Sequence, residues 1–425
     1  MKRKKPQAVQ IEKNFVGVAQ HNRAGGGPVI SRISTNGPWY RRKLAPLIVV
    51  LGFGIVTPIL YCCFIYYRQY SYSHQCFKAG AAQDWPKMEQ VAKAWARWQP
   101  STAAPWLKAA EAATRQGNLL GTAEYLAQLP DSAPVEAFHE LSRIQLELLN
   151  QPESAAQTCR RTLTAYPADV ESHQRLFAYY AMTCQRRELI TEARRAINEG
   201  GASLVTFAYY AAANWLTLAN GHDFNLRMLK NDPNNELFLV ASLIHLLANP
   251  ELIPKSEAAV PMEQYEAMIA SMLQRFPKNI ELLASRGRFL CQHGATDDLA
   301  KLLADIPDQA SDDCRFWRLK GWYHSAREEW SEARNAYEHA LDLWPMDWIS
   351  QHELAIVLRR ADTLDNADKM QRRANLGKEV MRNILSAPKL DVSNRSVFEK
   401  IIAYMEECGE LSTAKSLRRL LDSPS

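Results

Sequence analysis

Signals of β-structure are scarce in this sequence. Alternating runs flanked by Asn-Gly or Asp-Gly turns are nearly absent, and the 18 glycines and 21 prolines cluster at the ends of periodic segments. With 425 residues and 47% apolar content, the chain can nevertheless bury a large core, or a long quasi-one-dimensional one. The sequence therefore predicts an all-α protein.

Patterns of metal and nucleophile sites are also missing. The His-Glu pairs at 139–140 and 352–353 begin like the helix of a zinc protease, but no second histidine follows three residues later. No Cys-x-x-Cys occurs, and the glycine-rich stretch at 25–28 lacks the Lys-Ser/Thr of a phosphate loop. Single histidines such as His245 lie on apolar faces, which favours core residues. We expect no enzyme activity, catalytic residue, metal, cofactor or small-molecule substrate.

One segment differs from the rest of the chain. The 24 residues from Leu44 to Tyr67 carry no charge, and about 20 apolar residues span a membrane. Residues 1–43 hold ten Lys and Arg against one acid, a net +9, so the other 382 residues sum to −4. The positive-inside rule then puts the N-terminus in the cytoplasm. We expect a single-pass anchor in the cytoplasmic (inner) membrane, with the later residues extracytoplasmic or periplasmic. The mildly acidic body argues against nucleic-acid binding.

The stretch from 316 to 345 has the pattern of two amphipathic helices joined by a short turn. Small residues on the facing sides allow a close approach, and aromatic side chains fill the gap. Ser331 is the expected N-cap of the second helix, which a proline then ends. The packing positions are Trp317, Gly321, Ala333, Tyr337, Ala340 and Pro345. Such a hairpin cannot bury its outer faces alone, so we expect repeats of it.

The pattern recurs at a constant spacing along the chain. Gly287, Gly321 and Ala355 stand at equal intervals of about 34 residues, a period typical of stacked helical hairpins. In this respect the sequence resembles the tetratricopeptide repeat family, strongly over 280–347, moderately over 106–198 and 348–422, and poorly over 199–262. The resemblance implies a right-handed superhelical solenoid of helical hairpins, here preceded by one transmembrane helix, and a role in binding other proteins.

Composition and periodicity divide the chain into five parts. They are a basic, disordered cytoplasmic tail (1–40), a transmembrane anchor helix (41–70), N-terminal repeats (71–200), an irregular helical region (201–262) and C-terminal repeats (263–425). A helix break is expected at Gly200. Six cysteines follow the predicted span, and their irregular spacing favours small apolar core residues over a disulfide framework.

The resemblance also implies a binding face. In the tetratricopeptide family, the first helix of each hairpin lines a concave groove, so the groove positions can be counted from Ile280, Cys314 and Trp348. Five arginines, one histidine and one tryptophan fall there against a single acid, Glu281. The predicted groove residues are Arg288, Arg315, Arg318, Trp322, His352, Arg359 and Arg360. We expect them to face solvent and to bind an acidic segment of a partner protein.

These features favour a membrane-anchored scaffold that presents an extracytoplasmic solenoid to protein partners. The alternative is an envelope biogenesis or assembly factor that docks a client enzyme or cofactor carrier. An RNA-reading helical repeat is disfavoured by the predicted topology and the charge of the body. The repeat arm of a glycosyl transferase is disfavoured because no catalytic domain follows the repeats.

Overall fold

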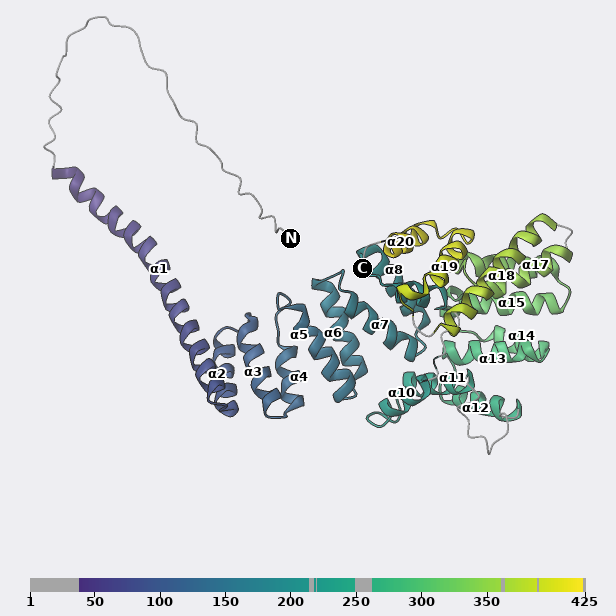
Figure 1. Cartoon of the computed structure of the whole chain (residues 1–425), viewed down its shortest axis with the longest axis horizontal. Coiled ribbons are helices and arrows are strands. Elements are labelled where there is room, and N and C mark those ends of the chain that lie inside the picture. Colours follow the sequence, from purple (N-terminus) through teal and green to yellow (C-terminus); the bar gives the residue numbers. More distant parts are fainter. Residues whose placement is uncertain are drawn as a thin grey trace, which may run out of the picture. The chain divides into compact units, whose positions relative to one another are not determined.

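The computed structural model describes residues 38–213, 218, 220–248, 262–360, 364–387 and 390–422, with side chains from Thr57 onward except those of 262, 263 and 392. Every regular element in these ranges is a helix, as predicted (Figure 1). The chain divides into two compact units, 1–68 and 69–425. Most of the predicted cytoplasmic tail lies outside the described residues.

Helix α1 (Pro38–Ala81) runs through the boundary between the two units. The predicted span, 44–67, lies within this helix, but the side chains of 44–56 are outside the described part. Among the residues that are described, no helix has the length and apolarity needed to cross a membrane. The anchor therefore stays a prediction from the sequence.

The first hairpins of the second unit form what we call the N-terminal arm, residues 69–165, whose helices follow one another in a row (Figure 1). After the end of α1, its helices are α2 (Trp85–Trp98), α3 (Ala103–Arg115), α4 (Leu119–Ala127), α5 (Val135–Arg143), the π-helix Ile144–Leu148 and α6 (Pro152–Ala165). Asp84 and Asn118 accept backbone hydrogen bonds at the starts of α2 and α4. Trp95 is buried in the core of the first hairpin, and the partly buried Trp85 and Trp98 pack against the same core.

The remaining helices form a second group, from α7 to α20. Their bounds are α7 (Val170–Met182), α8 (Arg186–Glu199), α9 (Leu204–Ala211), α10 (Gly221–Met228), α11 (Glu236–Ala248), α12 (Met262–Arg275), α13 (Ile280–Gln292), α14 (Thr296–Ala304), α15 (Cys314–Ala326), α16 (Trp330–Leu343), α17 (Trp348–Arg360), α18 (Leu364–Ser386), α19 (Arg395–Glu407) and α20 (Leu411–Asp422). Short 3-10 turns precede α15 and α19.

This second group does not continue as an open array. Helix α9 packs against α18, α19 and α20, which brings the C-terminal helices back to the middle of the chain (Figure 1). One apolar core contains Phe207 and Tyr210 together with Phe398 and Leu417. We call helices α7 to α20 the closed ring. The sequence pattern did not predict this closure.

The hairpin of α15 and α16 packs as the spacing predicts. A Cβ atom at Gly321 would lie 2.6 Å from the Tyr337 ring, so only glycine allows this approach. Ala333, Tyr337 and Ala340 are fully buried, and α16 ends two residues before Pro345. The ring of the partly buried Trp317 contacts that of His339 across the hairpin, with centroids 4.0 Å apart and planes tilted by 48°.

Other details of the repeats are confirmed or corrected. A side chain at Gly287 would collide with Leu319 of the next hairpin, which explains the glycine there. The N-cap prediction for Ser331 is wrong, because α16 already begins at Trp330 with Glu329 as its cap residue. Residues 327–329 form the turn, and the positive φ of Glu328 lets the chain reverse early.

The irregular region contains short helices rather than regular hairpins. Gly200 ends α8 in the left-handed conformation (φ +80°), as the expected break requires. Helix α9 ends at Ala211 after 8 residues, α10 has 8 residues, and α11 covers the apolar segment Glu236–Ala248. The described cysteines form no disulfide; five are buried: Cys76, Cys159, Cys184, Cys314 and Cys408.

Candidate functional site

Two of the predicted groove arginines are buried in ion pairs. Arg315 is 8% exposed and donates to both carboxylate oxygens of Glu281, at 2.8 and 2.7 Å, and also to Asp313. Arg318 donates to the buried carboxylate of Asp347 at 2.6 and 2.9 Å. The expectation that both side chains face solvent is therefore wrong.

The repeat period explains this correction. Glu281 stands one period of 34 residues before Arg315. Because successive repeats stack, equivalent positions of neighbouring first helices lie side by side. The opposite charges of Glu281 and Arg315 at this separation were a signal that the count of groove positions left unused. Arg318 instead pairs with Asp347, 29 residues later, directly before the next first helix.

The other predicted groove residues remain accessible. Arg288, Arg359 and Arg360 are exposed, and Trp322 and His352 are half-buried. Arg288 and Arg360 make no ion pair with any described residue. Arg359 pairs with the exposed Asp368 at 3.8 Å and donates to the Gln371 side-chain carbonyl at 3.4 Å. Together with the exposed Ile356, these residues of α13, α15 and α17 form what we call the inner strip, comprising Arg288, Trp322, His352, Ile356, Arg359 and Arg360.

One carboxyl group interrupts this positive surface. Glu353, on α17, is half-buried, and burial raises its pKa against the opposing influence of His352 and Arg318. No hydrogen bond to its side chain occurs among the described residues. The inner strip is therefore basic at its exposed arginines, with one poorly solvated carboxyl group next to His352.

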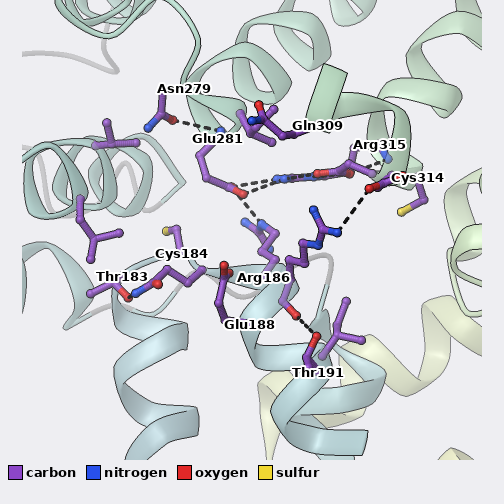
Figure 2. A pocket seen from close by; sticks show the side chains of 18 of the residues that line it. Thr183, Cys184, Arg186, Glu188, Thr191, Asn279, Glu281, Gln309, Cys314 and Arg315 are labelled. Carbon is purple, nitrogen blue, oxygen red and sulfur yellow. Dashed lines mark hydrogen bonds and ion pairs between the residues drawn. The ribbon is translucent and has the colours of Figure 1, made fainter. Parts of the chain in front are cut away.

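A cavity of about 650 Å³ lies inside the closed ring, and sequence reasoning missed it (Figure 2). Helix α8 forms one wall, and the first residues of α11, α13 and α15 form the other, with the end of α16 beside them. The cavity brings together segments that are far apart in the chain, from Thr183 to Trp344. It therefore depends on how the ring closes and has no local sequence signature.

Charged side chains cross this cavity as an alternating series. Arg186 donates to Glu281 at 3.1 Å, Glu281 accepts from Arg315, and Arg315 also donates to Asp313 (Figure 2). Burial would raise the pKa of Glu281, but the guanidinium groups of Arg315 and Arg186 outweigh it and lower that pKa. The pKa of Asp313 is lowered in the same way. Because the charges alternate, this group is neutral and links α8 to α13 and α15.

A cysteine and a histidine meet beside this cavity without forming a nucleophile. Cys184 Sγ lies 3.6 Å from His245 Nε2. His245 Nδ1 accepts the Leu218 N–H, so Nε2 carries the proton, which it donates to the Met182 carbonyl. Burial lowers the pKa of His245 to about 4 and raises that of Cys184 to about 12. The imidazole therefore has no free lone pair to take the thiol proton, and it serves as the core histidine that the sequence predicted.

The packing of consecutive helices defines the class of this protein, which in its described part is an all-α array of stacked helical hairpins. No protein-family model and no curated protein matches the chain. Its fold is similar to a tetratricopeptide repeat protein from Parabacteroides merdae, at 10% identity over 60% of this chain and 98% of that one, with a TM-score of 0.31. It is also similar to the APC/C hetero-tetramer Cut9-Hcn1 (12% identity, 83% and 79% covered, TM-score 0.32) and to yeast Tom70 (13%, 90% and 96%, 0.27).

Proposed function

We propose that this protein is a membrane-anchored scaffold that binds a segment of a partner protein along the inner strip. One observation carries the proposal. The strip combines three exposed arginines, two of them without an ion pair in the described structure, with the accessible side chains of Trp322 and Ile356. Elsewhere on the same helices, Arg315 and Arg318 are already neutralised.

The chemistry of the strip favours an acidic segment that also carries apolar residues. A guanidinium group holds a carboxylate through two parallel hydrogen bonds, and binding surfaces are rich in arginine and tryptophan. Trp322 and Ile356 supply apolar area next to these charges. In the free protein, water solvates the exposed arginines, so leaving them unpaired costs little folding free energy. Ion pairs that they form with a partner then add to the binding free energy.

Exchange of the three arginines tests this proposal in the full-length chain. Arg288, Arg359 and Arg360 are changed together to glutamate, and the control variant changes the exposed Arg334, Arg372 and Arg382, on second helices, to glutamate. Proteins that copurify with each variant are quantified by mass spectrometry. The inner-strip variant should bind its partner at least about tenfold more weakly, a difference of about 1.4 kcal/mol in binding free energy, and should copurify with correspondingly less of it. The control variant should copurify with as much partner as the wild type. Equal loss in both variants, or no loss in either, would contradict the proposal.

The membrane part of the proposal rests on the sequence alone. The uncharged run at 44–67 and the +9 charge before it support an anchor in the inner membrane, with the N-terminus inside and the ring outside. Protease added to spheroplasts should then digest residues beyond 70 and spare the tail. Protection of the ring would refute this orientation. The identity of the captured protein decides whether the scaffold serves an envelope assembly pathway with a client enzyme or cofactor carrier.

A further inference from the structure

The cavity of the closed ring shares no residue with the inner strip, so it is a second candidate binding site that is independent of the strip. Four arginines line it, and three of them have carboxylate partners. Arg186 and Arg315 share Glu281, and Arg187 pairs with Asp312 at 3.3 Å. The fourth, Arg194, has no carboxylate oxygen at ion-pair distance among the described residues. The cavity wall thus carries one guanidinium group whose charge is not neutralised at contact.

Arg194 is held in place although it lacks an ion pair. Its guanidinium carbon lies 5.9 Å from the ring centre of Tyr210 and 5.7 Å from that of Trp344. Its Nε atom donates to the Tyr210 hydroxyl at 3.3 Å. The two rings themselves meet edge to face, with centroids 4.9 Å apart. These contacts restrain the side chain of Arg194, which stays exposed, and its Nη groups donate no hydrogen bond to a described residue.

The surroundings of Arg194 set the kind of ligand. Ile190, Leu237 and Leu343 also line the cavity and offer apolar contacts. Three further charged side chains without an ion pair line it, Lys278, Glu188 and Glu236. Lys278 offsets Glu188, and the Glu236 carboxylate accepts a hydrogen bond from the Asn279 amide at 2.9 Å. Glu410 acts on the Tyr210 hydroxyl from outside the cavity but makes no ion pair with Arg194. An anion with an apolar neighbour therefore matches the free donors and the apolar wall together.

We propose that the cavity of the closed ring is a binding site for a carboxylate of a peptide, with Arg194 as the residue that grips it and the apolar wall as the contact for the adjacent side chain. The volume, about 650 Å³, lies within the usual range of ligand pockets, about 300–1,000 Å³. The site is composite, because Arg194 comes from α8 and Trp344 follows α16. It exists only while the ring is closed.

Calorimetric titration of the full-length chain tests the site. The probe is the blocked peptide acetyl-Leu-Glu-Leu-Glu-Leu-amide, compared with its counterpart in which both glutamates are glutamine. We expect the glutamate peptide to bind at least about tenfold tighter, a difference of about 1.4 kcal/mol. Arg194→Gln should abolish this preference. Arg187→Gln, on the same wall but already paired, should keep it, and so should the inner-strip variant.

A further variant and competing ligands distinguish a structural role of Arg194 from a binding role. Arg194→Lys keeps the charge over the two rings but lacks the paired donors, so it should retain the fold and show an intermediate preference. Equal affinity for the two peptides, no binding of either, or an undiminished preference in Arg194→Gln would overturn the proposal. Displacement of the peptide by succinate or inorganic phosphate at equal concentration would assign the site to small anions and overturn the assignment to a peptide.

Discussion

The N-terminal arm and the closed ring use the same hairpin in two different ways. In the arm, apolar side chains form small separate cores, one around Trp95 and another around Phe138. In the ring, three smaller cores accompany one large core that joins helices far apart in the chain, with Phe207 of α9 beside Phe398 of α19, and this large core also takes in part of α6. Stability in the arm is therefore local and passes between neighbours, whereas the ring couples helices that are far apart in sequence. A repeat pattern in the sequence does not distinguish these two cases.

The ion pairs of the arm and of the ring also differ in range and burial. Ion pairs of the arm are mostly between residues one helical turn apart and are partly exposed, as in Glu140 with Arg143. The ring instead contains long-range pairs with little exposure, such as Glu281 with Arg315 and Asp347 with Arg318. An exposed pair contributes at most about 1 kcal/mol, whereas removing one member of a buried pair costs several times more. This contrast gives the largest expected effect of a single substitution.

Glu281→Gln should destabilise the ring by about 3 kcal/mol, because it removes the acceptor shared by Arg186 and Arg315 and leaves two buried guanidinium groups with less compensation. The matched change in the arm, Glu140→Gln, should cost less than about 1 kcal/mol. Urea unfolding of both full-length variants measures the difference. If both variants lose a similar amount of unfolding free energy, the buried ion pairs of the ring stabilise it no more than an exposed pair stabilises the arm.

The sequence predicts much of the hairpin but little of the ring. Gly321 and Ala333 are predictable because close helix packing demands small residues at a fixed spacing, and Tyr337 because an aromatic ring fills the gap between them. All three are buried in the structure. Periodicity reports contacts within a hairpin and between consecutive hairpins. Contacts between α9 and α19 depend on the accumulated rotation of many hairpins, so no local pattern records them.

The candidate site shows the same limit. Arg288, Arg359 and Arg360 were placed on an accessible face by counting positions, and they are exposed. Arg315 and Arg318 were misjudged because counting positions on one helix leaves out the charges of the neighbouring repeat. Arg194 was missed altogether. Its aromatic contacts join α9 to the end of α16, so only the closed ring reveals it.

Acid should affect the ring through His245. Burial lowers its pKa in the folded protein to about 4, against 6.5 as its ordinary value. As the pH falls, His245 takes up its proton in the unfolded chain before it does so in the folded protein. The contribution of the neutral, buried imidazole to the unfolding free energy is therefore complete above pH 6.5 and is lost as the pH falls toward 4. The loss amounts to about 3 kcal/mol. Unfolding free energies measured from neutral pH down to about pH 4.5 should fall more steeply for the wild type than for His245→Gln, and parallel curves would contradict this assignment.

A bulky substitution in the core shows how far a local disturbance spreads in the arm and in the ring. Its expected destabilisation is smaller than that of the changes above. Gly321→Leu should clash with the Tyr337 ring and cost about 1–3 kcal/mol, and Ala109→Leu in the arm core should cost a similar amount. In the ring, the disturbance should spread beyond the neighbouring hairpins, and in the arm it should stay within α2 to α4. Limited proteolysis mapped by mass spectrometry reports the spread. New cleavage confined to α15 and α16 in the Gly321→Leu variant would oppose the account.

Hydrogen exchange of α9 tests ring closure most directly. Phe398, on α19, is fully buried in the core that also contains Phe207, although the two residues are far apart in the chain. If the ring is closed, Phe398→Ala should speed amide exchange in α9 (Leu204–Ala211) as well as in α19, because both helices lose the same packing. Phe138→Ala, the matched change in the arm, should leave α9 unchanged. Exchange in α9 that is identical in the wild type and Phe398→Ala would show that the array is open, and the cavity of the ring would then have no basis.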